Sequence, residues 1–269
     1  MKGAIRVAAV QTVSGGDVAG NLAQARDLVA AAARAGAGLV LLPEYFGILG
    51  ARATDKLLAR ERDGVGPQQS FLSETARAHG IVLIGGSVPI ACDDPSRVRS
   101  ACLVYGPDGA RLARYDKIHL FRFAQGEEAY DETRTIEPGS EPVACLTLGM
   151  RVALSICYDL RFPELYRSLG ASDLIVVPSA FTHTTGSAHW HLLLRARAVE
   201  NQSFVLAAAQ GGVHANGRRT YGHSLLVDPW GEIVAERIED GPGIVVGEID
   251  AARIAEVRAR LPALDHRVL

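Results

Sequence analysis

Short apolar runs alternate with segments of helical periodicity through the first half of the chain. Apolar runs bounded by turn residues are typical of strands, and apolar residues spaced three and four apart, followed by glycine, are typical of helices. Two extended runs around a Pro-Asp-Gly turn indicate a hairpin. The pattern therefore predicts strands over residues 4–11, 38–44 and 81–88, helices over 21–37 and 68–80, and a hairpin over 100–117.

The second half repeats this pattern in outline. Residues 39–46 (LVLLPEYF) match residues 174–181 (LIVVPSAF) position by position, proline over proline. Residues 104–114 match residues 226–236, which places one Pro-x-Gly turn over the other. Chance similarity between apolar strand patterns is the alternative interpretation of these matches.

The repeat predicts how the two halves pack. Each half reads as one mixed sheet with helices on one face, and an apolar sheet face must be buried against another layer. Two such halves bury their sheets against each other, which gives an α/β fold, a four-layer α-β-β-α sandwich of two mixed sheets with a pseudo-twofold internal repeat. No composition break or linker separates the halves, so we expect a single domain over residues 1–269.

Composition narrows the class of protein. Of 269 residues, 48% are hydrophobic and 22% charged, which is typical of a soluble globular protein, and the net charge of −2 offers no basic field for a nucleic acid or an anionic membrane. No apolar stretch is long enough to span a membrane, and the N-terminus has no secretory signal pattern. Four cysteines without CxxC spacing do not resemble a disulfide framework. We therefore expect a cytoplasmic protein.

Two reactive side chains are expected where predicted strands end. Glu44 ends one apolar run, and Cys157 ends another directly before a helical pattern. A helix N-terminus stabilises a thiolate and lowers the pKa of the cysteine, so Cys157 is a candidate nucleophile. The alternative is an inert packed thiol, which is the interpretation favoured for the other cysteines, Cys92, Cys102 and Cys145.

A nucleophilic thiol needs a base and a group that stabilises an oxyanion. None of the eight histidines is distinguished by its placement. The carboxylate of Glu44 is a candidate base, and Lys117, just past a predicted strand, is a candidate cation. For Lys117 the alternative is a solvated charge on the surface.

Three motifs in order carry a family resemblance. LLPEYF at Glu44, YDKIHLF at Lys117 and ICYDLRFPELYRSL at Cys157 resemble the Glu-Lys-Cys triad of the nitrilase superfamily of carbon–nitrogen hydrolases. GSAHWHLLLRARAVENQ and YGHSLLVDPWGEIVAE resemble the second half of that family, so the resemblance covers nearly the whole chain. The motifs are most similar to the Nit branch, which contains deaminated glutathione amidases and omega-amidases, with the former nearer.

The resemblance implies a mechanism. Glu44 takes the proton of Cys157, the thiolate attacks an amide carbonyl, and Lys117 with a backbone N–H near Tyr158 binds the oxyanion. A thioester is then hydrolysed to acid and ammonia. The resemblance also implies a further acid that assists the triad, and Glu132 occupies its position. The same loop offers other carboxylates, namely Glu127, Glu128 and Asp131. The alternative interpretation is a solvated acidic loop.

The resemblance also implies a substrate pocket and partners. Tyr158 and Arg161 are expected to contact substrate, Arg161 by pairing with a carboxylate. An ion pair between Arg161 and Glu164 or an acid of a loop explains Arg161 at least as well. Tyr45 is a pocket wall or a core residue. His191 stands where many relatives have an acidic residue. The expected substrate is a small-molecule amide, the expected assembly is a homodimer or larger homo-oligomer, and no cofactor or metal is expected.

Several other functions are alternatives to hydrolysis of a carboxylate-bearing primary amide. An omega-amidase acting on 2-oxoglutaramate, an N-carbamoyl amino acid amidohydrolase and a nitrilase share the chemistry, whereas a non-catalytic binding protein would have lost it. A metal-dependent hydrolase could use His183, His189 and His191. However, residues two apart on a helix point to different sides, so His189 and His191 are not expected to share one metal.

Overall fold

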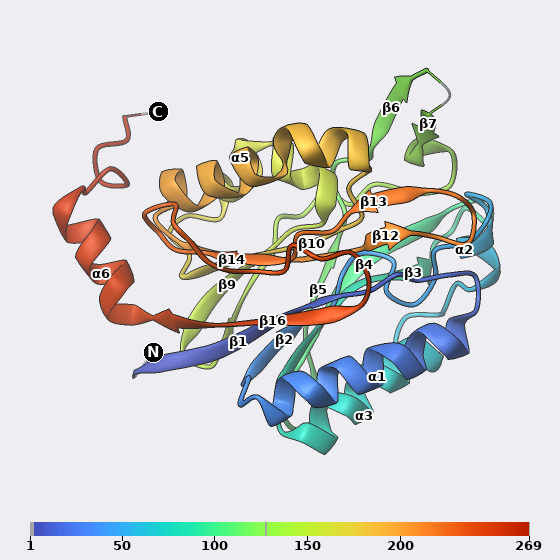
Figure 1. The fold of residues 1–269 in the computed structure, drawn as a ribbon, viewed down its shortest axis with the longest axis horizontal. Helices are drawn as coiled ribbons and strands as arrows, with labels where there is room; N and C mark the ends of the chain where they lie inside the picture. The colour runs from blue at the N-terminus through green and yellow to red at the C-terminus, as the bar shows by residue number, and fades with distance from the viewer. Residues whose placement is uncertain (1–2, 127, 269) are drawn as a thin grey trace.

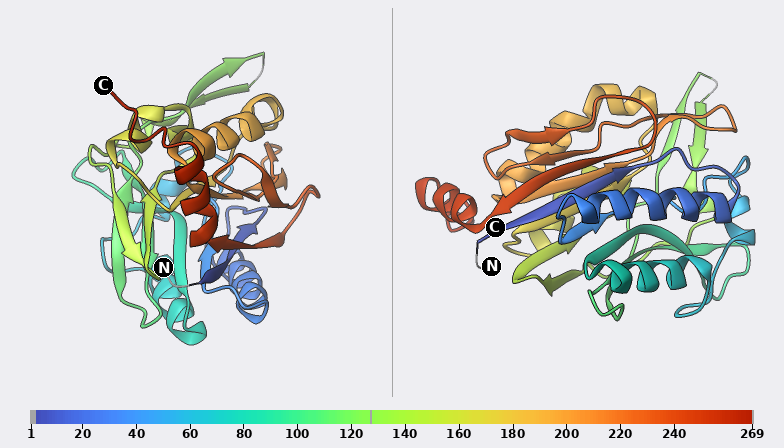
Figure 2. Two further views of the ribbon diagram at one scale, coloured as in Figure 1. Left: turned by 90° about the vertical axis from the view of Figure 1, so that its left-hand side faces the viewer. Right: turned by 60° about the horizontal axis from the view of Figure 1, so that its bottom comes forward.

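The computed structural model describes residues 3–126 and 128–268. Its two largest sheets have six strands each and lie face to face, with helices on both outer sides, as Figures 1 and 2 show. The expected four-layer α-β-β-α sandwich is confirmed. None of the described helices is long and apolar enough to cross a membrane.

The strands are as follows. The first sheet, in spatial order, consists of β16 (Gly243–Asp250), β1 (Ala4–Gln11), β2 (Leu39–Leu41), β3 (Val82–Ala91), β4 (Val98–Tyr105) and β5 (Arg111–Asp116). The second consists of β15 (Ile233–Glu236), β14 (Leu225–Val227), β11 (Phe204–Ala209), β10 (Leu174–Ser179), β9 (Met150–Leu154) and β8 (Ala144–Thr147). Two small hairpins are β6 (Arg122–Gln125) with β7 (Glu128–Asp131), and β12 (Gly211–Val213) with β13 (Arg219–Tyr221).

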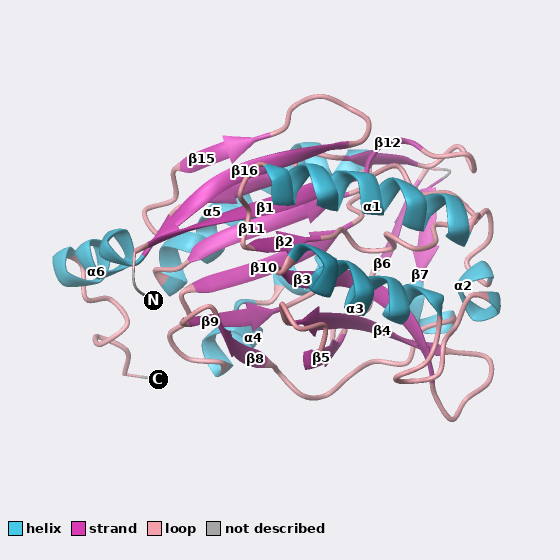
Figure 3. Ribbon diagram, turned by 90° about the horizontal axis from the view of Figure 1, so that it is seen from below, coloured by secondary structure: helices cyan, strands magenta, loops and turns pink. Residues whose placement is uncertain are grey.

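The helices cover the outer faces of the sheets. On the first sheet lie α1 (Val18–Arg34) and α3 (Pro67–His79), which Figure 3 shows in front of its strands. On the second lie α4 (Pro163–Ser168) and α5 (His183–Asn201). The remaining helices are α2 (Asp55–Leu58), the 3-10 helices η1 (Glu132–Arg134) and η2 (Cys157–Arg161), and α6 (Ala251–Arg260).

Local sequence explains the helix boundaries. The side chain of Asp17 accepts hydrogen bonds from the N–H groups of Ala19 and Gly20 and so caps the start of α1. Pro67 opens α3, and Gly80, at φ 62°, ends it in the left-handed conformation that glycine adopts without strain. The predicted helix over 68–80 is therefore confirmed, whereas the predicted strand over 38–44 is shorter in the structure and ends at Leu41.

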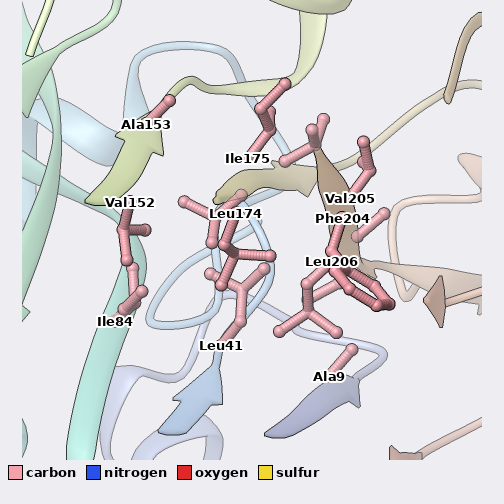
Figure 4. Close-up of a cluster of buried hydrophobic side chains, with 14 of the residues drawn as sticks. Ala9, Leu41, Ile84, Val152, Ala153, Leu174, Ile175, Phe204, Val205 and Leu206 are labelled. Atoms are coloured by element: carbon pink, nitrogen blue, oxygen red, sulfur yellow. The ribbon is translucent and has the colours of Figure 1, made fainter. Parts of the chain in front are cut away.

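Both faces of the central strands are apolar because each face is covered. Successive side chains of a strand point to opposite faces. Ala9 of β1 lies in the core between the two sheets, whereas its neighbour Ala8 packs in the core that includes α1 and α3. Figure 4 shows the inner core, where Ala9, Leu41 and Ile84 of the first sheet meet side chains of the second, namely Val152, Leu174 and Leu206.

The internal repeat is visible in the strand order. In each sheet three parallel strands, β1-β2-β3 or β9-β10-β11, are followed by an antiparallel hairpin, β4-β5 or β14-β15. One antiparallel strand completes the other edge, β16 beside β1 and β8 beside β9. The strand orders therefore correspond one to one, and the expected pseudo-twofold repeat is confirmed.

Candidate active site

A pocket of about 290 Å³ opens where β2 and β10 end. Six of the residues singled out from the sequence lie in its wall: Glu44, Tyr45, Glu132, Cys157, Tyr158 and Arg161. The wall also contains Phe121, Ala180, Phe181, Thr182, Thr185 and Arg218. Lys117 lies directly behind this wall, bonded to two of its carboxylates.

Glu44 follows β2 and is buried. One carboxylate oxygen accepts a hydrogen bond from Lys117 Nζ at 2.8 Å, and the other accepts one from the backbone N–H of Ala180 at 2.9 Å. Ala180 follows β10, the strand equivalent to β2 in the repeat. The side chain of Gln210 donates to the Glu44 carbonyl oxygen at 2.9 Å and fixes the backbone from a third strand end. Gln210 carried no signal in the sequence analysis, because its partner is 166 residues away.

Lys117 follows β5 and is 1% exposed, so the alternative of a solvated surface charge is wrong. Its ammonium donates to Glu44 and to both oxygens of Glu132, at 2.8 Å and 3.0 Å. Burial lowers the pKa of Lys117, but the carboxylates of Glu132 and Glu44 outweigh it and hold the pKa well above its ordinary value. Lys117 is therefore a fixed cation.

Among the described acids of its loop, Glu132 is the one that lines the pocket. Besides Lys117, it accepts hydrogen bonds from the Tyr45 hydroxyl at 2.6 Å and from the backbone N–H of Phe121 at 2.7 Å. Burial raises its pKa, but Lys117 and Lys56 outweigh burial and lower it overall. Glu128 lies on the β6–β7 hairpin outside the pocket wall, and Glu127 lies outside the described residues.

The local structure at Cys157 corrects the sequence prediction. Strand β9 ends at Leu154, and Cys157 opens the 3-10 helix η2, which is too short to act as a helix dipole. Burial raises the pKa of the thiol, the carboxylate of Glu44 raises it further, and Lys117 lowers it only in part. The pKa of Cys157 therefore lies well above its ordinary value, and the expectation of a lowered pKa is wrong.

The backbone at the site is strained. Cys157 and Tyr45 have φ values of 51° and 58°, in the left-handed region that side chains with a Cβ rarely adopt. Such strain persists only where the surroundings hold it, and it is concentrated at functional sites. Here the N–H of Tyr45 donates to Ser87 Oγ at 2.9 Å. The turn that carries Cys157 is held by Asp159, which is fully buried.

Asp159 is a second residue that the sequence analysis missed. Its carboxylate accepts hydrogen bonds from the Tyr115 hydroxyl at 2.8 Å, from the backbone N–H of Ile156 at 2.8 Å and from that of His119 at 3.0 Å. His119 Nδ1 lies 2.7 Å from the same carboxylate. Asp159 therefore ties the Cys157 turn to the segment that contains Lys117. The only sequence signal was its place two residues after the cysteine.

Aromatic and cationic side chains form the outer part of the pocket. Tyr158 packs edge-on against Phe121, and the guanidinium of Arg161 lies 5.8 Å from the Tyr158 ring and 5.4 Å from the Phe181 ring. Arg161 forms no ion pair with Glu164 or with any other carboxylate of the described residues. Its polar neighbour is His189 Nδ1, at 3.3 Å.

Arg218 is a further cation of the pocket that the sequence analysis did not single out. It lies in the loop between β12 and β13, donates to the Ala180 carbonyl oxygen at 2.7 Å and covers the Tyr130 ring at 4.8 Å. Its Nε is buried and has no acceptor among the described residues. A buried N–H without an acceptor is costly, which suits a guanidinium that meets a ligand.

His189 and His191 of α5 have separate partners. His189 contacts Arg161 at the pocket, whereas His191 contacts Glu236. The geometric argument against a shared metal at His189 and His191 therefore agrees with the structure. Within the described residues, one group of potential metal ligands converges, and it contains His191 but none of the pocket residues.

Comparison with known proteins identifies the family. A profile of the carbon–nitrogen hydrolase family matches residues 6–259. This chain belongs to that family. It is 39% identical over 267 residues to a deaminated glutathione amidase of Synechocystis sp., with 97% of each chain covered. It is 38% identical over 266 residues to an omega-amidase of Mus musculus, covering 97% of this chain and 94% of the relative.

A solved structure connects the family to cysteine chemistry. A glutamate-to-glutamine mutant of an amidase from Nesterenkonia sp. AN1, with acrylamide added at its active-site cysteine, superposes with a TM-score of 0.79. It is 30% identical, and the match covers 96% of this chain and 98% of that one. The resemblance to the Nit branch of the nitrilase superfamily is confirmed, and the protein is an amidase that acts on carbon–nitrogen bonds other than peptide bonds.

Proposed function

We propose that this amidase hydrolyses the primary amide of a small substrate that carries a carboxylate, through a thioester on Cys157. The observation that carries the proposal is the buried Lys117–Glu44 pair, 2.8 Å apart, beside a pocket whose wall contains Glu44 and the Cys157 thiol. A base, a fixed cation and a nucleophile around one cavity are the groups that acyl transfer requires.

In this proposal Cys157 is a neutral thiol at rest, because burial and Glu44 raise its pKa. Glu44 removes the proton as the sulfur attacks the amide carbonyl, so charge develops beside Lys117. The ammonium of Lys117 and a backbone N–H near Tyr158 stabilise the oxyanion. Glu44 then returns the proton to the departing ammonia and afterwards activates the water that hydrolyses the thioester.

Glu132 has a supporting role in this mechanism. Two carboxylates around one ammonium leave a net negative charge, and the hydrogen bonds from Tyr45 and Phe121 disperse it. We propose that Glu132 holds Lys117 in place while Glu44 changes its protonation state. Lys117 then stays charged throughout the cycle.

The two arginines of the pocket are the reason to propose a substrate that carries a carboxylate. Arg161 and Arg218 both line the cavity, and each has guanidinium donors that no carboxylate of the described residues occupies. Guanidinium groups bind carboxylates through paired, charge-assisted hydrogen bonds. The substrates named for the relatives, deaminated glutathione and omega-amides, make such compounds the first to be tested.

A panel of amides tests the substrate class. Ammonia release is measured with deaminated glutathione, 2-oxoglutaramate, an N-carbamoyl amino acid and a nitrile, before and after incubation with a chelator. We expect release from the carboxylate-bearing primary amides, unchanged by the chelator. Equal turnover of the nitrile would contradict the proposed branch of chemistry, and loss of activity with the chelator would favour a metal-dependent hydrolase.

A second experiment tests the nucleophile. Mass spectrometry of the enzyme during turnover is expected to show an acyl adduct on the peptide that contains Cys157. Cys157→Ala abolishes both adduct and ammonia release, whereas Cys92→Ala, which removes a free thiol outside the pocket, preserves both. Turnover by Cys157→Ala would rule out the thioester route, and a total absence of turnover by wild type would favour a non-catalytic protein.

We also propose a homodimer or larger homo-oligomer in a reducing, cytoplasmic setting. The described cysteines are all free, and a nucleophilic thiol must remain reduced. Leu192 and Val199, one side of α5, are 68% and 47% exposed, which suits contact with a second copy. Light scattering of the purified protein measures the assembly, and a monomer at all concentrations would contradict it.

A further inference from the structure

Three side chains from three separate elements converge beside α5, and none of them belongs to the pocket wall. His191 lies on α5, His223 lies in the loop between β13 and β14, and Glu236 ends β15. His191 Nε2 and His223 Nδ1 each lie 2.7 Å from the same oxygen, Glu236 Oε1. All three candidate ligand atoms lie within 4.8 Å of one another.

We propose that His191, His223 and Glu236 form a binding site for one divalent transition-metal ion of the zinc type. Two imidazole nitrogens and one carboxylate oxygen are a ligand set that zinc and its neighbours in the first transition row accept. Metal–ligand bonds of about 2.1 Å in tetrahedral geometry separate the ligand atoms by about 3.4 Å. A small outward movement of the three side chains therefore admits the ion.

The surroundings hold these ligands in place. The His223 carbonyl oxygen accepts a hydrogen bond from Trp190 Nε1 at 2.8 Å, and His223 has a left-handed backbone at φ 56°. The Tyr221 ring stacks on the His223 ring, with centroids 4.3 Å apart, and the His191 ring meets both edge-on. Ligand rings that are oriented by packing and hydrogen bonds favour metal affinity.

Charge also suits a cation at this position. The Glu236 side chain lies within hydrogen-bond distance of both imidazole rings, at 2.7 Å from each, so all three groups face one point. Neutral imidazoles supply lone pairs to a metal, and the carboxylate supplies one negative charge. The Tyr221 ring contacts both histidine ligands, and the His183 ring packs edge-on against Tyr221. His183 and Tyr221 are therefore further polar neighbours of the site.

A metal ion bound at this site would stabilise the fold and would not contact the amide substrate. The three ligands join α5 to β15 and to the loop before β14, and Trp190, next to His191, packs against Phe181 of the pocket wall with ring centroids 4.9 Å apart. Binding in the folded state stabilises that state by RT ln(1 + L/Kd), where L is the free metal concentration. The three ligands are not residues of the pocket wall, so this site does not depend on which amide is the substrate.

The test is a titration of the full-length protein with Co²⁺ and with Zn²⁺ near neutral pH. We expect one equivalent of Co²⁺ to give visible d–d absorption without a thiolate charge-transfer band, and Zn²⁺ to displace it. Cys157→Ala is titrated in parallel, since a catalytic thiol is itself a metal ligand. Its unchanged titration would separate this site from the pocket.

Variants locate the ion. His191→Gln and Glu236→Gln are expected to raise the dissociation constant at least about tenfold, whereas His79→Gln, at the end of α3 on the opposite outer layer, leaves it unchanged. Thermal midpoints in chelator show whether each variant is folded, and Zn²⁺ should raise the midpoints of wild type, Cys157→Ala and His79→Gln more than those of His191→Gln and Glu236→Gln. Absence of binding, equal affinity in His191→Gln, or loss of binding in Cys157→Ala would each overturn the proposal.

Discussion

At the level of single residues, burial beside opposite and like charges determines what each side chain of the site does. The same pair of carboxylates holds the pKa of Lys117 high and, through Glu44, raises the pKa of the Cys157 thiol. In the proposed mechanism the ammonium therefore stays charged, whereas the thiolate forms only when Glu44 takes its proton. We propose that Cys157 and Glu44 act together in this way rather than through a preformed thiolate.

The reactivity of Cys157 tests this coupling. Wild-type Cys157 is expected to react slowly with iodoacetamide at neutral pH, with a rate that continues to rise above the ordinary thiol pKa. In Glu44→Gln the like charge is removed, so the thiol pKa falls and alkylation at neutral pH becomes faster, while amide hydrolysis drops by about 10²–10⁴-fold. Peptide mass spectrometry follows the Cys157 peptide separately from that of Cys92. Slower alkylation in Glu44→Gln would contradict the assigned cause.

Arg218 offers a second test at this scale. Arg218→Ala is expected to raise KM for a carboxylate-bearing amide by about tenfold to a hundredfold, because a charge-assisted hydrogen bond contributes about 1.5–3 kcal/mol. For an uncharged short amide KM should change little. Steady-state kinetics with both amides separates binding from catalysis. An equal loss on both substrates would show that Arg218 acts through the pocket structure, by its hydrogen bond to Ala180.

Glu132 connects the site to stability against acid. Its pKa is lowered in the folded protein from a reference value of 4.5, so the unfolded chain binds more protons as the pH falls. The stability that Glu132 contributes is present above the unfolded pKa and is lost as pH falls through the folded pKa. Thermal midpoints between about pH 5.5 and about pH 3 should therefore fall less steeply for Glu132→Gln than for wild type. Glu128→Gln, on the β6–β7 hairpin, is the matched control and should follow wild type.

At the level of elements, equivalent strands of the repeat deliver partners to one site. Glu44 follows β2 and Ala180 follows β10, and their hydrogen bond of 2.9 Å joins the two sheets at the pocket. Strand β3 approaches from the side, with a register shift between Gly85 and Val88 that brings its backbone close to the Glu44 segment. Side chains placed by strand ends are held more rigidly than side chains on long loops.

Gly86 makes that approach possible. A Cβ at Gly86 would lie 1.9 Å from the Pro43 carbonyl oxygen and 2.5 Å from that of Leu42, so neither strand could stay in place. Gly86→Ala is expected to lower the free energy of unfolding by about 1–3 kcal/mol and to reduce hydrolysis by displacing Glu44. Denaturant unfolding and ammonia release measure the two effects. Gly16→Ala, where a Cβ meets nothing within 4 Å, is the matched control and should leave both unchanged.

At the level of the whole molecule, the two halves of the repeat are not independent. Strand β16, near the C-terminus, crosses to the first sheet and pairs with β1 over its full length, as Figures 1 and 3 show. One core cluster contains side chains of both sheets. We therefore propose that residues 1–269 form one cooperative domain, as the sequence predicts.

Unfolding measured by two probes tests this cooperativity. Both tryptophans, Trp190 and Trp230, belong to the second half, whereas far-ultraviolet circular dichroism reports on both halves. The two signals are expected to change at one midpoint during denaturant unfolding. A dichroism transition without a change in tryptophan fluorescence would show that the first half unfolds alone.

The sequence alone predicted the element types and the internal repeat, and its motifs supplied three candidate catalytic residues. Short continuous apolar runs predict the central strands, because both faces of each central strand are covered. The two matched segments, each an apolar run that contains a proline, predicted one sheet in each half. Glu44, Lys117 and Cys157 were singled out because each follows a strand within a motif that resembles the nitrilase superfamily, and their catalytic roles stay a prediction. Element types and motifs depend on neighbours within a few residues, so they can be read without coordinates.

Only the tertiary structure decided the electrostatics and the long-range contacts. Burial and the carboxylate of Glu44, 113 positions earlier in the chain, raise the pKa of Cys157. The helix that was expected to lower this pKa is too short to do so. Hydrogen bonds to partners 38, 44 and 166 residues away position Arg218, Asp159 and Gln210, respectively. Desolvation and Coulomb interactions act through space, so no local pattern records them.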